Sequence, residues 1–416
     1  MRWRRWTWIM PVVLLLVVVS GFLAYQTVRP GEWVTAATRP YPEVAPSPVP
    51  GVIASLRAAP LIVDRRLRVS TSTHDVWAEL LDAPDGVTPF WSYHKFPAQV
   101  VNAVAVDAED GAPPVVVVKL SGGRLIGIDA TTGRVAWRAT VGAAVGDDNH
   151  GGPTGVQTLY GTELNSLFTA ADARGHAVVI NAGDSSADAF DPSTGRRLWH
   201  LDTPDCLGVT WTGPTVFVAV QYCGEPRTLH LYDAGTGHQL TTWRPQKDPD
   251  AIDFPTGCSV ATSRCDGFDA GGAGGSWRIH PDGTLTAVSD RDPPTVAADI
   301  GDVTLRRADS GRRTIRAVSR VDGSELWSRS FDADIDEVAA DGTAAYVITR
   351  DRLSRLDPRT GAVEQQVALP SGASESVHVY ATDGYVVIDQ SNFDFTDRNA
   401  AWSLPGTARP VLLIAT

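Results

Sequence analysis

The sequence lacks the short catalytic signatures that spacing alone can reveal. It has no Gly-x-Ser-x-Gly elbow, no P-loop and no His-Glu-x-x-His, and its nine histidines are scattered singly. Beyond about residue 60 it also has no long amphipathic helical pattern. These absences exclude the enzyme classes that such motifs define, and we expect no catalytic residue.

Positive charge is scarce. The chain has 36 basic against 48 acidic residues and a formal charge of −12. Such an acidic surface repels phosphate backbones, so we expect no nucleic-acid partner. Arginine supplies nearly all of the basic charge, a bias typical of a high-GC bacterial genome; the few lysines are Lys95, Lys119 and Lys247.

The one long hydrophobic run lies near the N-terminus, where 18 uncharged residues extend from Trp8 to Tyr25. A helix of about this length can cross a hydrocarbon core of ~30 Å. The run is longer than the ~7–15-residue core of a cleaved secretory signal. The sequence therefore predicts an uncleaved transmembrane helix over residues 8–25. The short head, residues 1–7, carries Arg2, Arg4 and Arg5, so we expect it in the cytoplasm and the rest of this single-pass protein outside.

A proline-rich segment follows the predicted span. Residues 26–59 contain six prolines after position 29 and little apolar periodicity. Prolines at this density favour extended polyproline conformations. We expect a semi-rigid linker that lifts a domain of residues 60–416 off the membrane.

That domain reads as all-β, built from one recurring unit. An apolar strand leads into a turn of the form Asp-x-x-Thr-Gly, and the next strand usually contains a tryptophan. The clearest copies hold Asp129, Gly133 and Trp137, then Asp191, Gly195 and Trp199. Looser copies hold Asp233, Gly237 and the delayed Trp243; Gly323 and Trp327; Asp357 and Gly361, with Gln365 in the tryptophan position; and Asp82, Gly86 and Trp91.

The spacing of the turn glycines gives the architecture. Most lie roughly 40 to 60 residues apart, and Gly283 fills the double gap between Gly237 and Gly323. This interval suits a four-stranded propeller blade with its loops. The sequence predicts a seven- or eight-bladed β-propeller, in which an eighth blade would join both ends of the domain: residues 61–69 with the strand from Gly384 or with residues 411–416.

The chemistry of the unit is structural. The aspartate can accept hydrogen bonds from turn amides, and glycine supplies the positive φ that a hairpin requires. Tryptophan offers a large apolar face with one donor, which suits packing against the next blade.

The unit resembles the PQQ-like repeat of quinoproteins, whose tryptophan-docking motif runs approximately Ala-x-Asp-x-x-x-Gly-x-x-x-Trp. Ala189, Asp191, Gly195 and Trp199 match it throughout, and Gly127 takes the alanine position of the preceding copy. The resemblance covers about residues 60–390 and implies that the first and last strands complete one blade together. It speaks to fold more than to activity.

The four cysteines lie on the side predicted to be extracytoplasmic, where disulfides persist. Three pairings are possible; the sequence-local one joins Cys206 to Cys223 and Cys258 to Cys265. A zinc site is the alternative, but separations of 17, 35 and 7 contain no Cys-x-x-Cys pair.

Two clusters of acidic residues are candidate metal sites. Asp147, Asp148, Asn149 and His150 are consecutive and rarely all point at one ion, so we read them as a polar loop. Asp332, Asp334 and Asp336 begin like a calcium loop, but Glu337 stands where that loop needs glycine and Thr343 where it needs glutamate. We interpret them as a solvated strand and turn, and expect no metal site.

Two functions of different class remain. The first is a non-catalytic binding or scaffolding module for a protein or cell-envelope component, without a cofactor. The alternative is a quinoprotein oxidoreductase; the resemblance implies PQQ at the propeller axis, calcium, a catalytic aspartate and commonly a disulfide of adjacent cysteines. The chain has no adjacent cysteines and is short for that class. A ligand-sensing ectodomain is a third reading, but the cytoplasmic head is too short for an output domain. We expect the binding module.

Overall fold

The computed structural model consists entirely of strands, turns and loops over the residues that it describes. These are residues 31–44, 49–56, 59–84, 87–107, 111–142, 166–183, 185–202, 207–221, 227–245, 254–259, 264–270, 275–288, 296–307, 312–370, 378–389 and 411–416. Within these ranges there is no helix that is long and apolar enough to cross a membrane. The predicted span, residues 8–25, lies outside them and stays a prediction.

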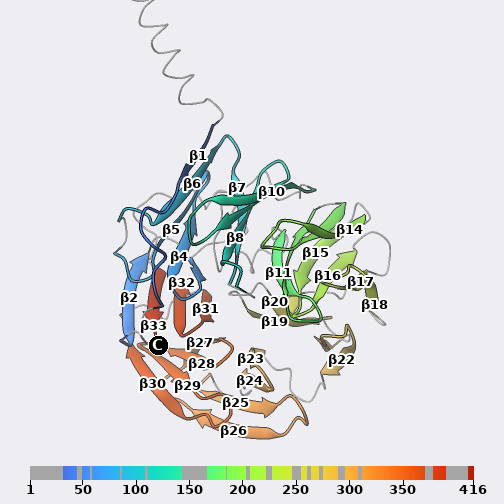
Figure 1. Cartoon of the computed structure of the whole chain (residues 1–416). Helices are drawn as coiled ribbons and strands as arrows, with labels where there is room; N and C mark the ends of the chain where they lie inside the picture. The colour runs from blue at the N-terminus through green and yellow to red at the C-terminus, as the bar shows by residue number, and fades with distance from the viewer. Residues whose placement is uncertain are drawn as a thin grey trace, which may run out of the picture.

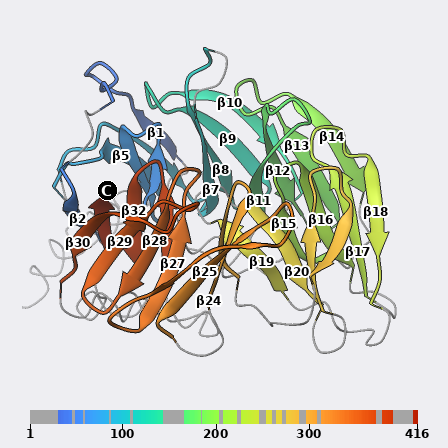
Figure 2. The same cartoon turned by 90° about the horizontal axis from the view of Figure 1, so that it is seen from below.

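The strands form eight blades that follow one another around a central region (Figure 1, Figure 2). Blade 1 contains β3 (Leu61–Val63), β4 (Leu67–Thr71), β5 (Asp75–Leu80) and β6 (Trp91–Phe96); blade 2 contains β7 (Val100–Val106), β8 (Val115–Leu120), β9 (Arg124–Asp129) and β10 (Val135–Thr140); blade 3 contains β11 (Leu167–Ala171), β12 (Ala177–Ala182), β13 (Ser186–Phe190) and β14 (Arg197–Asp202); blade 4 contains β15 (Leu207–Thr212), β16 (Val216–Gln221), β17 (Thr228–Asp233) and β18 (Gln239–Trp243).

The second half repeats this order. Blade 5 contains β19 (Phe254–Ser259), β20 (Arg264–Asp269), β21 (Ser276–Ile279) and β22 (Leu285–Val288); blade 6 contains β23 (Val296–Ile300), β24 (Val303–Arg307), β25 (Thr314–Ser319) and β26 (Glu325–Ser330); blade 7 contains β27 (Ile335–Ala340), β28 (Ala345–Thr349), β29 (Arg352–Leu356) and β30 (Val363–Ala368); blade 8 contains β31 (His378–Thr382), β32 (Tyr385–Asp389), β33 (Val411–Ala415) and β2 (Gly51–Leu56). The prediction of an all-β propeller with seven or eight blades is confirmed, with eight.

Burial follows position within the blade. Every residue of β8 is buried, whereas in the outer strand β10 exposed positions alternate with half-buried ones and with the buried Trp137. A strand covered by blades on both faces has no solvated side, so its sequence becomes a continuous apolar run such as Val115–Val118. Sheet-on-sheet packing between neighbouring blades therefore forms the core.

The ring is closed by strands from both ends of the domain. β33 lies between β32 and β2 and pairs antiparallel with each. Both C-terminal candidates for this blade are correct, because β32 begins just after Gly384 and β33 starts at Val411. The N-terminal candidate is wrong: residues 61–69 form β3 and β4 of blade 1, and Gly51–Leu56 closes the ring instead.

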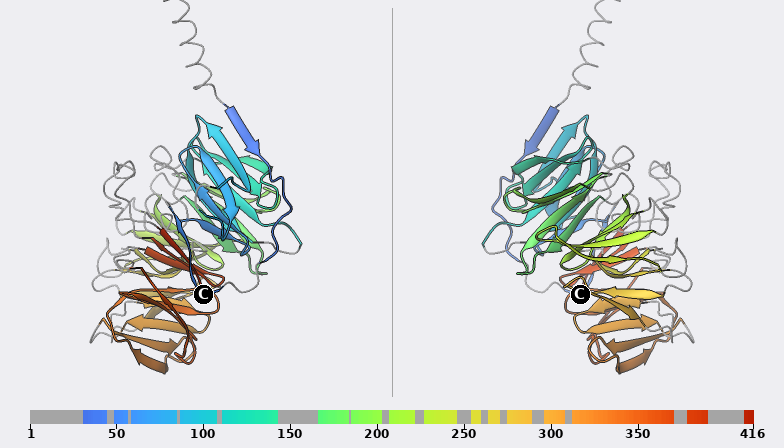
Figure 3. Two further views of the ribbon diagram at one scale, coloured as in Figure 1. Left: turned by 90° about the vertical axis from the view of Figure 1, so that its left-hand side faces the viewer. Right: turned by 90° about the vertical axis from the view of Figure 1, so that its right-hand side faces the viewer.

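The segment predicted as a linker is part of the propeller. β1 (Gly31–Thr35) adds a fifth strand to blade 1 by pairing with β6, and Figure 3 shows it at the outer edge of that blade. Tyr41 then packs near Phe90 and hydrogen-bonds Asp64. The boundary at residue 60 is therefore wrong, because the short runs in β1 and β2 find partners in blades 1 and 8 despite the prolines between them.

Candidate functional site

The repeat tryptophans lie between successive blades. Trp137 of blade 2 covers the turn of blade 3: its Nε1 donates to the Pro192 carbonyl at 2.7 Å, and a Cβ on Gly195 would come within 2.5 Å of its ring. Trp199 does the same over blade 4, with the Ala234 carbonyl as acceptor at 2.7 Å. Trp91 and Trp327 repeat the arrangement through the carbonyls of Ala130 and Pro358, each at 2.8 Å.

A β-bulge precedes three of the docked tryptophans, Trp137, Trp199 and Trp327. In β10 the register skips Ala136, and in β14 it skips Leu198, one residue before the docked ring. Such an extra residue turns the following side chain out of the regular alternation. The recurring turn and bulge therefore set the direction in which each blade contacts the next.

The turn aspartates cap their own hairpins. Asp191 accepts hydrogen bonds from Ser193 N, Ser193 Oγ and Thr194 N. Burial opposes ionisation, but these donors hold the pKa of Asp191 below its ordinary value. Asp129, Asp233 and Asp357 accept equivalent bonds from their turns, and the φ of Gly133, Gly195, Gly237, Gly283, Gly323 and Gly361 is positive. Gly86 lies outside the described residues.

Two interfaces depart from the pattern. In blade 4 the bulged Leu240 lies against Gly283, while Trp243 packs edge-on against Trp277 and Phe268 of blade 5. Trp243, which stands two residues later in its repeat than the docked tryptophans, thus does not occupy the docking position. At Gly323 no described atom lies within 4 Å of an added Cβ, so no side chain of the described residues docks on that turn.

Of the four cysteines, only Cys265 has a described side chain. It is fully buried and disulfide-bonded. Cys258 stands directly opposite it in the β19–β20 register. Cys206 and Cys223 lie outside the described residues, so both bonds of the sequence-local pairing stay predictions.

Of the two acidic clusters, the structure describes only the one at residues 332–336. Residues 147–150 lie outside the described ranges. Asp332 and Asp334 are exposed before β27; Asp334 pairs with Arg313 at 2.8 Å, and Asp336 lies within the strand. Burial, followed by the nearby Asp334 carboxylate, raises the pKa of Asp336. Across the described ranges no three His, Cys, Asp or Glu side chains gather as a cation would require.

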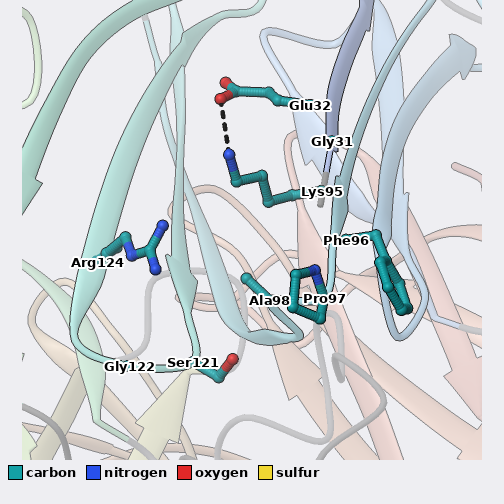
Figure 4. Close-up of a pocket in the computed structure, with 9 residues that line it drawn as sticks. All are labelled: Gly31, Glu32, Lys95, Phe96, Pro97, Ala98, Ser121, Gly122 and Arg124. Atoms are coloured by element: carbon teal, nitrogen blue, oxygen red, sulfur yellow. Dashed lines mark hydrogen bonds and ion pairs between the residues drawn. The ribbon is translucent and has the colours of Figure 1, made fainter. Parts of the chain in front are cut away.

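One open cavity of about 610 Å³ lies where β1 and β6 meet blade 2 (Figure 4). β1 and the end of β6 form one wall, and the β8–β9 turn forms the other. Its lining residues are Gly31, Glu32, Lys95, Phe96, Pro97, Ala98, Ser121, Gly122 and Arg124. No sequence motif marks these residues, although Lys95 is one of only three lysines.

Cations outnumber anions at this cavity. Glu32 is shared by Lys95, at 3.0 Å, and by Arg138 of β10, at 2.6 Å. Burial opposes ionisation of Glu32, but the two cations hold its pKa below the ordinary value. Arg124 is exposed at the cavity and forms no ion pair with any residue of the described ranges. The lining, with Lys95 and Arg124 against Glu32, therefore carries one net positive charge and can accept an anionic group.

The match to a family model shows that this chain belongs to the family of the outer membrane protein assembly factor BamB. The match covers residues 51–162 and 277–415, which is more than half of the chain. A search of the curated proteins finds no match.

Several solved propellers are similar at low identity. BamB from Moraxella catarrhalis is 14% identical with a TM-score of 0.46, over 88% of this chain and 100% of that one. The computationally designed Ika8 protein is 15% identical with a TM-score of 0.46, over 88% and 99%. The C-terminal WD40 domain of Sif2 is 12% identical with a TM-score of 0.43, over 92% and 99%.

Proposed function

We propose that this protein is a membrane-anchored, extracytoplasmic scaffold that binds a protein or envelope partner and performs no chemistry itself. Membership of the family named for an outer membrane assembly factor is the observation that carries the proposal. The anchor rests on the apolar run Trp8–Tyr25 and the three arginines before it.

The docked interfaces support a scaffold. Trp91, Trp137, Trp199 and Trp327 each link two blades through ring packing and a hydrogen bond. Fixed neighbours hold the exposed turns in constant relative positions, and a pre-organised surface lowers the entropy that binding costs.

The decisive experiment is photocrosslinking in intact cells, followed by pull-down. Crosslinkers at Arg134, in the β9–β10 turn, and at Thr343, in the β27–β28 turn, sample exposed turns of two distant blades. We expect one discrete partner to crosslink at one or both positions. Absence of any specific crosslink from a panel covering every exposed turn would refute the scaffold.

Location and cofactor are tested separately. Alkaline extraction should leave the full chain in the membrane, and protease added to the extracytoplasmic side should remove the propeller. We propose that the protein binds no cofactor. Dye-linked oxidation of an alcohol or sugar by the full chain with PQQ and calcium would contradict the non-catalytic assignment.

A further inference from the structure

We propose that the cavity between β1 and blade 2 binds the phosphate of an anionic lipid headgroup, and that Trp33 inserts beside it into the membrane interface. The inference rests on the proposed membrane anchor. It extends that proposal because it names a ligand for the cavity beside β1 and states which edge of the propeller faces the bilayer.

The first step is the short distance along the chain. Tyr25 ends the predicted span, and Gly31 already pairs with Phe96 in blade 1. Six residue steps reach at most about 20 Å. The outer edge of blade 1 must therefore stay close to the membrane, and the cavity begins at Gly31.

The second step is the exposed apolar surface on the same strand. Trp33 is 56% exposed; Val34, on the opposite face of the strand, is 43% exposed. The Trp33 ring packs against His94 at 5.0 Å, which leaves its outer face free of that contact. Tryptophan with one packed and one open face suits the level of lipid headgroups.

The third step is charge. The chain as a whole is acidic, yet Lys95 and Arg124 line this cavity against one carboxylate, Glu32. Glu32 is already paired with Lys95 and with Arg138 outside the lining. Figure 4 shows the Arg124 guanidinium across the cavity from Lys95. A planar guanidinium can hold two phosphate oxygens at once, as the phosphate of a lipid headgroup offers them.

Native mass spectrometry of the detergent-solubilised full chain with phosphatidylglycerol tests the site. Arg124→Gln removes one contact worth about fivefold in affinity, so lipid adducts should fall about fivefold. Arg134→Gln is the matched control, because it removes an exposed arginine from the opposite end of β9 in the same blade. Adducts lost in Arg124→Gln and kept in Arg134→Gln support the site. Equal adducts in both variants, or displacement of the lipid by equimolar inorganic phosphate or by an acidic peptide, would overturn it.

Fluorescence quenching by brominated lipid tests the placement of Trp33. In vesicles of phosphatidylcholine and phosphatidylglycerol, Trp33→Phe should remove a quenched component that Trp327→Phe leaves unchanged. No difference between the two variants would overturn the insertion. If alkaline extraction shows the chain anchored while these tests fail, only the lipid site is refuted; if the chain is extracted, the anchor itself is wrong.

Discussion

Gly195→Ala probes the contact that joins blades 2 and 3. The alanine Cβ would come within 2.5 Å of the Trp137 ring, a distance that forces the ring to move. Its left-handed φ of 68° adds a backbone cost of about 1–2 kcal/mol. Gly323→Ala is the matched control, since its φ is 73° and no described atom lies within 4 Å of the new Cβ.

The two variants should differ in how far they lower the free energy of unfolding. Truncating a buried tryptophan costs about 3–5 kcal/mol, and Trp137 is only 8% exposed. Displacing it should forfeit a large share of that energy together with the hydrogen bond to Pro192. We expect Gly195→Ala to cost about 3 kcal/mol or more, and Gly323→Ala only the backbone cost of about 1–2 kcal/mol.

A double-mutant cycle makes the reasoning refutable. Urea unfolding of the full chain in detergent, followed by circular dichroism, gives the four free energies. Trp137→Ala alone should cost about 3–5 kcal/mol, and in that background Gly195→Ala should fall to about 1–2 kcal/mol. Equal effects of Gly195→Ala and Gly323→Ala, or a Trp137→Ala cost below about 1 kcal/mol, would refute the docked tryptophan.

Three further predictions concern ionisation and redox state. Burial opposes ionisation of Asp341, but hydrogen bonds from Tyr346, Thr343 and Ala344 lower its pKa below the ordinary value of 3.8. The Asp341 carboxylate therefore stabilises the fold above that pH, and this stabilisation is lost as the pH falls. The stability of Asp341→Asn in acid unfolding should converge with that of wild type below about pH 4. The hydrogen bond to Asp188 raises the pKa of His200 above 6.5. The protonated His200 therefore stabilises the fold at low pH, and this stabilisation disappears as the pH rises through the raised pKa. An NMR titration of His200 that shows a pKa at or below 6.5 would contradict this. Mass spectrometry of the non-reduced full chain should detect Cys258 linked to Cys265 and Cys206 linked to Cys223, and four free thiols would exclude both bonds.

The sequence predicts the repeat well because its signals are local. Asp191, Gly195 and Trp199 occupy one hairpin and its following strand, so their spacing carries the turn, the bulge and the docked ring. Where the spacing changes, as at Trp243, the same reasoning fails: the bulge delivers Leu240 to the neighbouring turn, and the tryptophan packs elsewhere.

Pairings between distant segments were not predictable from pattern. β1 and β2 each have five or six residues flanked by prolines, which resembles a linker until blades 1 and 8 provide partners. The cavity depends on the same pairings, because Glu32 reaches Lys95 and Arg138 only after β1 joins β6. No spacing rule connects residues 32, 95, 124 and 138.

The closing blade also fixes the order in which the ring can be completed. A chain that emerges from its N-terminus presents β2 first, and β33, its hydrogen-bonding neighbour, only after more than 350 further residues. Until then β2 and β32 are open strand edges, and such edges readily pair with other chains. Folding of the first seven blades can begin during synthesis, but the ring closes only when the last strand arrives. The exposed edges during that interval are where a chaperone would protect this protein.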